Sequence, residues 1–134
     1  MIIGTGIDII EVHRVDALLA RGGDRFVRRW FSPGEIEYCR ARARPAQHLA
    51  ARLAAKEAAI KALGPAWTAG LLLREIEVVT DGRGAPGLRL GGRAAEMARR
   101  AGVTALFVSL SHAGAYAAAT VIAEGSSLSH ATPR

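Results

Sequence analysis

The feature that most constrains the fold is an uninterrupted helical stretch in the middle of the chain. Residues 46–63 contain neither glycine nor proline and consist mostly of strong helix formers. Pro45 suits the first position of a helix, and Gly64-Pro65 is a stop signal. Apolar side chains recur along the stretch at helical spacing, at Leu49, Leu53, Ile60 and Leu63. The sequence therefore predicts one long helix that buries an apolar side.

The segments with strand composition occur largely in pairs. Residues 103–110 and 115–123 are apolar and are joined by a short S-H-A-G turn, and residues 74–80 lead through D-G-R-G-A-P-G into the apolar run L-R-L. Residues 2–12 form an isoleucine-rich strand around two glycines. Hairpin-like pairs mixed with helices, without a repeated βαβ period, predict an α+β fold. We expect a mostly antiparallel sheet packed against the long helix and shorter helices.

The shorter helices are predicted from their end signals. Residues 13–29 suit a helix that is interrupted at Gly22-Gly23 and followed by a second turn. Residues 32–35 (S-P-G-E) form a capping box with proline at the first helical position, so a helix should run from there to about Arg44. A further helix is expected over residues 92–100.

Length and cysteine content point to one cytoplasmic domain. A chain of 134 residues can bury a single core. We assign residues 1–124 to it and expect the polar segment 125–134 to be disordered. Cys39 is the sole cysteine, which fits a reducing compartment and an inert packed residue. The N-terminus lacks a basic leader, and no apolar run approaches the roughly 20 residues of a membrane span.

The charge of the chain indicates an acidic partner without naming it. The net charge is +6 and the pI is about 10.7, so nucleic acid, a membrane surface, a phosphorylated small molecule and an acidic protein all remain open. A nucleic-acid-binding domain is disfavoured, because only 5% of the residues are aromatic and no known binding motif is present. Steeply salt-dependent binding to generic DNA or RNA would support that alternative.

Two acidic residues are candidates for chemistry. Asp8 interrupts a strand of isoleucines, so its carboxylate needs solvent, a basic partner or a metal. Glu57 lies one helical turn before Lys61, and an ordinary ion pair worth a few tenths of a kcal/mol would explain it. Alternatively, two carboxylates from distant segments could hold magnesium together with substrate phosphates, and Lys61 would neutralise phosphate charge.

His112 is the other candidate, in the predicted turn between the last two strands. A histidine at such a turn is often simply exposed to solvent. It could also bind a phosphate oxygen or orient water, because an imidazole can donate or accept a proton near neutral pH.

In combination, these segments resemble the three signature segments of holo-acyl-carrier-protein synthases. They are G-T-G-I-D-I-I-E-V at 4–12, R-L-A-A-K-E-A-A-I-K-A-L-G at 52–64 and S-H-A-G-A-Y-A-A-A-T-V-I at 111–122, in the order and at the spacings of that family. With S-P-G-E at 32–35 and the G-x-P loop at 84–86, the resemblance covers residues 1 to about 124.

The resemblance implies transfer of 4′-phosphopantetheine from coenzyme A to a serine of apo-acyl carrier protein, in fatty-acid or polyketide biosynthesis. It implies magnesium held by Asp8 and Glu57, with Lys61 as a third catalytic residue. Coenzyme A would be contacted by Arg52, Lys56, Lys61, Gly64, Pro86 and His112. The general base stays open between a water near Asp8, Glu57 itself, and a water relayed through either.

The resemblance also implies partners. The family docks its acidic carrier protein on the segment that here carries Arg14, Leu18, Arg21, Arg25 and Arg28. A solvated basic face is the alternative. Ile10 stands where larger two-half relatives carry a second acidic residue, which agrees with the short class. Such short members resemble homotrimers with sites between subunits. Neither nucleic acid nor a membrane is expected as a partner.

Some positions depart from the family pattern. Ala85 replaces a lysine or arginine that is common in the G-x-P loop, so a phosphate or adenine contact is missing or comes from Arg83. His48 and Leu53 stand where an aromatic residue is common. A relative that binds coenzyme A or carrier protein without catalysis is a further alternative, against which Asp8, Glu57 and Lys61 argue.

Overall fold

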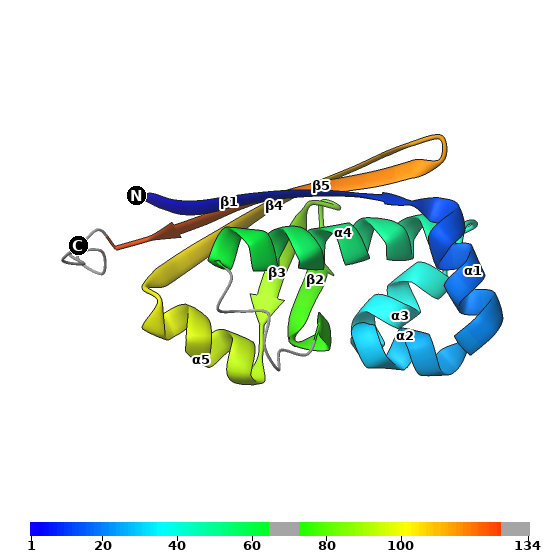
Figure 1. Ribbon diagram of the computed structural model, residues 1–134, viewed down its shortest axis with the longest axis horizontal. Coiled ribbons are helices and arrows are strands. Elements are labelled where there is room, and N and C mark those ends of the chain that lie inside the picture. Colours follow the sequence, from blue (N-terminus) through cyan, green and yellow to red (C-terminus); the bar gives the residue numbers. More distant parts are fainter. Residues whose placement is uncertain (65–72, 127–134) are drawn as a thin grey trace.

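The computed structural model of the protein describes residues 1–64 and 73–126 (Figure 1). The described elements follow one another as β1 (Ile2–Glu11), α1 (Val12–Gly22), α2 (Asp24–Trp30), α3 (Pro33–Arg40), α4 (Pro45–Leu63), a 3₁₀ turn (Leu73–Glu75), β2 (Ile76–Thr80), β3 (Pro86–Leu90), α5 (Gly92–Arg100), β4 (Val103–Ala113) and β5 (Tyr116–Gly125).

The strands form two antiparallel sheets rather than the one expected sheet. The larger sheet has the order β1-β5-β4, and the smaller one is the β2-β3 hairpin. In the larger sheet Asp8 pairs with Ala119 and Ala119 with Leu110. The α+β class and the antiparallel pairing are confirmed.

Helix α4 lies along one face of the larger sheet, with the β2-β3 hairpin and α5 below it and α1–α3 gathered at one end of the molecule (Figure 1). Its contact face is made largely of alanine, which lets the helix approach the sheet closely. Two glycines of β1 complete this approach. A Cβ on Gly4 would lie 1.9 Å from the carbonyl oxygen of Ala62, and one on Gly6 would lie 1.9 Å from that of Ala58.

The sheet face opposite α4 is apolar and has no covering element among the described residues. The strand register places Ile7 beside Thr120 and Phe107 beside Ile122 on that face. Ile7 is 64% exposed and Phe107 is 54% exposed. An apolar face of this kind is typical of a surface that packs against another molecule.

The helix ends follow the sequence signals with one correction. The side chains of Ser32 and Glu35 form the predicted capping box. Helix α3 ends at Arg40, however, and not near Arg44. The Ala41 N–H bonds to the carbonyl oxygens of Cys39 and Glu37, which tightens the last turn, and Pro45 disfavours helical backbone in the residue before it.

The C-terminal hairpin is longer than predicted. Strand β4 continues to Ala113, so most of the S-H-A-G segment is strand, and Gly114 turns the chain with a φ of 57°. Strand β5 continues to Gly125, one residue past the expected end of the domain, and the Gly125 N–H bonds to the Met1 carbonyl oxygen at 2.9 Å. Residues 127–134 of the expected disordered tail lie outside the described residues.

The remaining expectations concern Cys39 and the membrane. Cys39 is fully buried, and burial raises the pKa of its thiol to about 11, which fits an inert packed residue. No helix within residues 1–64 and 73–126 has the length and apolar composition that a membrane crossing requires.

Candidate active site

The structure brings Asp8, Glu57 and Lys61 together where α4 crosses β1. Lys61 Nζ lies 3.2 Å from Asp8 Oδ1 and donates to the Ile7 carbonyl oxygen at 2.9 Å. Residues 57 and 61 are one helical turn apart and therefore share a side of α4. The ion pair of Lys61 is therefore with Asp8 of β1 and not the expected one with Glu57, which Lys61 affects only through its charge.

The electrostatics of Glu57 show how close these charges are. Burial raises the pKa of the Glu57 carboxyl, and the Asp8 carboxylate raises it further, whereas Lys61 and Arg14 oppose the rise. Two carboxylates that repel each other across two elements would be stabilised by a shared cation. Clusters of three or more acidic, histidine or cysteine ligands are absent from the described part of the chain. The pair therefore fits a cation that takes one or two carboxylates and completes its shell with water and phosphate, as magnesium does.

A second group of polar residues surrounds Arg52. The Arg52 side chain is 4% exposed, and its Cζ lies 4.1 Å from the centroid of the Tyr38 ring. Its Nη2 makes a long hydrogen bond of 3.5 Å to Thr80 Oγ1. Its Nε is buried and has no hydrogen-bond partner within residues 1–64 and 73–126. A buried, unpartnered guanidinium nitrogen indicates a place for an anionic acceptor.

His112 belongs to this second group through His48. The two imidazole rings lie 6.2 Å apart between centroids, and His48 lies at the same distance from the Tyr38 ring. The Arg42 guanidinium sits 3.9 Å from the Tyr38 ring centroid, and its hydrogen bond lowers the pKa of Tyr38. Tyr38 and Arg42 were missed by the sequence analysis, because only the packing of α3 against α4 brings them to Arg52.

The two groups lie on opposite flanks of α4. Successive helix residues are rotated by about 100°, so Arg52 lies roughly 140° around the helix from Glu57. In the sheet, Asp8 is on β1 and His112 on β4, two strand spacings apart, or about 10 Å. The candidate residues therefore form two half-sites within a single chain. One half-site contains Asp8, Glu57 and Lys61, and the other contains Arg52 and His112.

Gly64 lies near the Asp8 half-site, and Pro86 lies near the Arg52 half-site. Gly64 ends α4 with a φ of 106°, one turn beyond Lys61, and a Cβ there would meet no described atom within 4 Å. Pro86 opens β3 and pairs with Thr80, the residue contacted by Arg52.

Lys56 corrects the predicted coenzyme A contacts. Its side chain is fully buried, and its Nζ donates to Glu35 Oε1 at 2.7 Å, to the Leu73 carbonyl oxygen at 3.0 Å and to the Ile76 carbonyl oxygen at 2.5 Å. All three ammonium donors are thus used inside the protein. Lys56 ties α4 to α3 and β2 and does not present its charge to a ligand.

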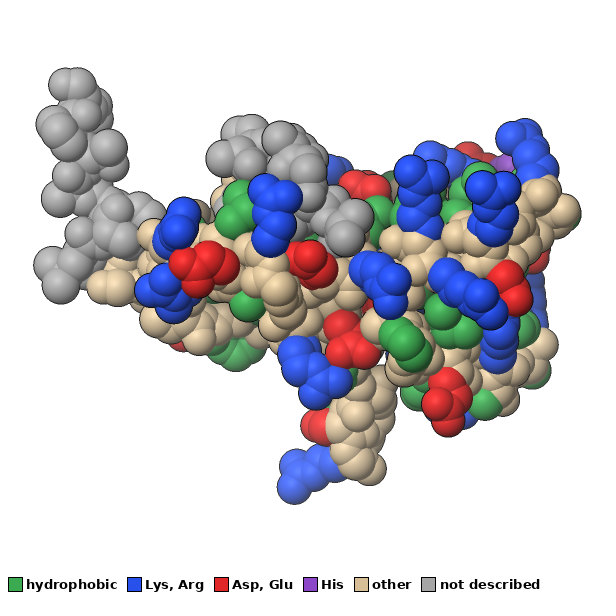
Figure 2. All heavy atoms as spheres, turned by 90° about the horizontal axis from the view of Figure 1, so that it is seen from below, with side chains coloured by type: hydrophobic (Ala, Val, Ile, Leu, Met, Phe, Trp, Pro, Cys, Tyr) green, Lys and Arg blue, Asp and Glu red, His purple; other side chains and the backbone are tan. Residues whose placement is uncertain are grey.

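The basic residues expected to dock a carrier protein lie on α1 and α2. Arg14, Arg21, Arg25 and Arg28 are exposed and Leu18 is partly buried. Figure 2 shows lysine and arginine side chains gathered over the end of the molecule formed by α1–α3. The charge of Arg14 lowers the pKa of the Glu57 carboxyl, so the basic segment begins near the half-site of Asp8 and Glu57.

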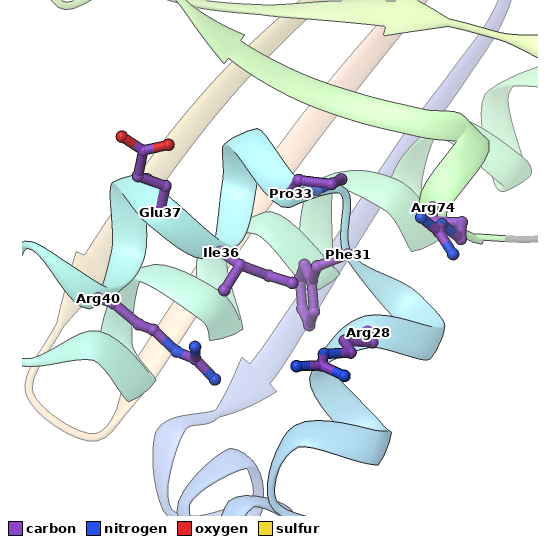
Figure 3. A pocket seen from close by; sticks show the side chains of 7 residues that line it. All are labelled: Arg28, Phe31, Pro33, Ile36, Glu37, Arg40 and Arg74. Atoms are coloured by element: carbon purple, nitrogen blue, oxygen red, sulfur yellow. The ribbon is translucent and has the colours of Figure 1, made fainter.

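A hollow between α2 and α3 lies beside the basic segment (Figure 3). It has a volume of about 550 Å³, with Phe31, Pro33 and Ile36 as apolar lining and Arg28, Arg40 and Arg74 among its charged lining residues. Asp24 pairs with Arg28 at 3.7 Å and also with Arg40. The hollow includes no residue of either half-site.

Known proteins resemble the chain over most of its length. The family described as the 4′-phosphopantetheinyl transferase superfamily matches residues 4–121. A holo-[acyl-carrier-protein] synthase of Geobacter sulfurreducens is 48% identical over 124 residues, which cover 92% of this chain and 98% of that protein.

Solved structures give the same result. A holo-[acyl-carrier-protein] synthase from Neisseria meningitidis has a TM-score of 0.85 and 31% identity, covering 92% of this chain and 99% of that one. A Bacillus anthracis holo-(acyl-carrier-protein) synthase in complex with CoA (3′,5′-ADP) has a TM-score of 0.75 and 33% identity. The match covers 94% of this chain and 99% of that one. On this evidence the chain belongs to the 4′-phosphopantetheinyl transferase superfamily, among the holo-[acyl-carrier-protein] synthases.

Proposed function

We propose that the protein transfers 4′-phosphopantetheine from coenzyme A to a serine of an apo-acyl carrier protein and releases adenosine 3′,5′-bisphosphate. The observation that carries this proposal is the convergence of Asp8, Glu57 and Lys61 in a chain 48% identical to a holo-[acyl-carrier-protein] synthase. The three residues to which the resemblance assigns metal and phosphate binding thus lie close together in the fold, although Asp8 is far from the other two in the sequence.

In the proposed reaction the serine hydroxyl of the carrier attacks the β-phosphorus of coenzyme A. A phosphorus–oxygen bond forms to serine, and the bond from that phosphorus to the bridging oxygen breaks, so the bisphosphate leaves with the bond electrons. The hydroxyl proton passes to Glu57 or to a water held by Asp8 or Glu57. Because the chemistry requires little covalent participation by the protein, positioning and charge neutralisation account for most of the catalysis.

Asp8 and Glu57 would hold magnesium, which when bound neutralises charge on the pyrophosphate. Lys61 adds a positive charge at the same place, since its side chain is 56% exposed and its Nζ lies 3.2 Å from Asp8 Oδ1. Burial and the Asp8 carboxylate raise the pKa of the Glu57 carboxyl in the free chain, and a bound cation would oppose that rise.

The Arg52 half-site would hold the 3′-phosphate of coenzyme A. Its support is the buried, unpartnered Arg52 Nε together with His112 on β4. The backbone at Pro86 would lie beside the nucleotide in the Arg52 half-site. The backbone at Gly64 would lie beside it near Lys61. Ala85, in the loop before Pro86, supplies no cation, so the recognition of this phosphate falls on Arg52 and its neighbours.

A homotrimer with sites between subunits would unite the two half-sites. The two half-sites lie on different flanks of α4 in one chain, and a neighbouring copy would bring complementary halves together. The exposed apolar sheet face with Ile7, Phe107 and Ile122 supports a partner copy as its cover. Asp8 and Glu57 of one subunit would then face Arg52 and His112 of the next.

The acidic carrier protein would dock on α1 and α2 through Arg14, Leu18, Arg21, Arg25 and Arg28. Its support is the exposed positive charge of this segment and the position of Arg14 next to Glu57, which would place the carrier serine near the metal half-site. The overall charge of +6 suits an acidic protein substrate. We place the protein in the cytoplasm, with a role in fatty-acid or polyketide biosynthesis.

The function is tested by incubating the full chain with apo-acyl carrier protein, coenzyme A and magnesium, followed by intact-mass measurement of the carrier. The expected product is a carrier heavier by one phosphopantetheine, with none formed on a carrier whose acceptor serine is replaced by alanine. An unchanged carrier mass, with the chain folded and magnesium present, would exclude the proposed activity.

A further inference from the structure

His48 has a chemical environment that the proposed transfer does not require. Its ring is partly buried on α4, one turn before Arg52, and lies 6.2 Å between centroids from both Tyr38 and His112. The Arg42 guanidinium lies 3.9 Å from the centroid of the Tyr38 ring. Three elements and one connecting segment therefore bring a phenol, two imidazoles and two guanidinium groups into one cluster.

The groups around His48 suit an anion rather than a cation. The acidic Glu77, which lines the adjacent hollow with Arg52 and Tyr38, is paired with Arg89. The charged or titratable groups that act on His48 are Arg52 on its own helix, His112 on β4 and Arg42 after α3. None of them is acidic. The buried Arg52 Nε has no hydrogen-bond acceptor among the described residues, so a bound anion could supply one. A phosphate monoester, with three oxygens and up to two negative charges, matches this set of donors.

The protonation of His48 depends on whether that anion is present. In the free protein burial lowers the pKa of His48, and Arg52, His112 and Arg42 lower it further, so the ring is neutral at pH 7. A doubly charged phosphate beside the ring would reverse the sign of the local field and favour the imidazolium form. Anion binding and proton uptake at the ring are then linked, because each makes the other more favourable.

We propose that His48 is a specificity-determining residue that takes up a proton when the cluster binds a phosphate monoester, and so strengthens selection for the 3′-phosphorylated nucleotide. The inference deepens the proposed function and rests on it, because the 3′-phosphate of coenzyme A is the monoester that would occupy the cluster.

The test is calorimetric titration of the full chain with adenosine 3′,5′-bisphosphate, and with adenosine 5′-monophosphate as the probe that lacks the 3′-phosphate. Titrations at pH 6.5 and 8.5, each in two buffers of different ionisation enthalpy, give the number of protons taken up. The variants are His48→Phe, which keeps a ring without a proton site, and His48→Gln in case the first variant does not fold. His13→Gln is the matched control, since His13 is an exposed histidine paired with Glu11 on another element.

The wild-type chain should take up protons with the bisphosphate and fewer with the monophosphate. His48→Phe should lose most of this uptake, and its affinity deficit should grow between pH 8.5 and 6.5 by about tenfold for each unit by which the anion raises the His48 pKa. His13→Gln should behave as wild type.

Two results would overturn the inference without touching the transfer reaction. One is equal proton uptake in wild type and His48→Phe. The other is uptake that is lost in His112→Gln but kept in His48→Phe, which would assign the proton to His112. Absence of bisphosphate binding at both pH values, or binding unaffected by Arg52→Ala, would instead remove the proposed 3′-phosphate site and the inference with it.

Discussion

Lys56 Nζ and Glu35 Oε1 are 2.7 Å apart, and both side chains are fully buried. Glu35 also accepts hydrogen bonds from the backbone N–H groups of Ser32 and Val78, so its carboxylate joins α3, α4 and β2. The capping glutamate of α3 is thus also the counter-ion of the lysine that precedes Glu57 in α4.

This pair predicts a specific pattern of stabilities. Lys56→Met leaves the Glu35 charge buried without its partner and should lower the free energy of unfolding by about 3–5 kcal/mol. Lys56→Met combined with Glu35→Gln removes both charges, but the glutamine oxygen can accept from only one of the Ser32 and Val78 N–H groups, which bond to Oε1 and Oε2 of Glu35. Because no unpaired charge stays buried, the double variant should lose less than the sum of the two single variants. Urea unfolding measures all three variants. A double variant as unstable as the sum of its single variants would show that the two residues do not act as a pair.

Gly6→Ala should destabilise the protein. The added Cβ would fall 1.9 Å from the Ala58 carbonyl oxygen, so the backbones of β1 and α4 have to separate. We expect a loss of about 1–3 kcal/mol in urea unfolding. Gly82→Ala is the matched control, because a Cβ there meets no described atom within 4 Å, and its effect should stay within about 0.5 kcal/mol. Similar losses in both variants would refute the close-approach explanation.

Glu57→Gln should abolish transfer while the protein stays folded. The substitution removes one of the two charges proposed to hold the metal without changing the volume of the side chain, and kcat should fall at least ~100-fold. Intact-mass kinetics with a magnesium titration measures the effect. Glu96→Gln, on exposed α5, should leave kcat unchanged. Activity retained by Glu57→Gln would show that the metal is held elsewhere.

Arg21→Glu should weaken carrier recognition and leave coenzyme A recognition intact. Arg21 is exposed on α1 and lies two turns beyond Arg14, which itself acts on Glu57. We expect KM for the carrier to rise about tenfold, equivalent to ~1.4 kcal/mol, with a weaker salt dependence. Arg93→Glu, on α5, is the control with the same change of charge. Equal increases in both Michaelis constants would contradict docking at α1.

The two half-sites predict complementation between inactive variants. In a trimer with sites between subunits, Glu57→Gln and His112→Ala impair opposite halves of each site. Co-refolding them in equal amounts should restore about a quarter of wild-type activity, because one interface in four pairs two intact halves. Ile7→Lys, on the apolar sheet face, should give a monomer in analytical ultracentrifugation. No recovery on mixing, with trimers present, would place each site within one chain.

The sequence alone determined the local structure and the order of the functional segments. The glycine-free and proline-free stretch 46–63, the capping box at Ser32 and the paired apolar segments each carry a short-range signal, and all appear in the structure. Asp8 and Glu57 could be singled out for the same reason, since a carboxylate in an apolar segment requires a partner.

Only the tertiary structure decided which charges are available to a ligand. Lys56 and Lys61 look alike in the sequence, but Lys56 points into the contact with Glu35, whereas Lys61 reaches the surface beside Asp8. The helical rotation alone separates Arg52 from Glu57 around α4, but it does not say which elements pack against either flank. The partners of a side chain depend on the rotation of α4 and on the elements packed around it, and those contacts join residues far apart in the chain. No local pattern encodes that arrangement.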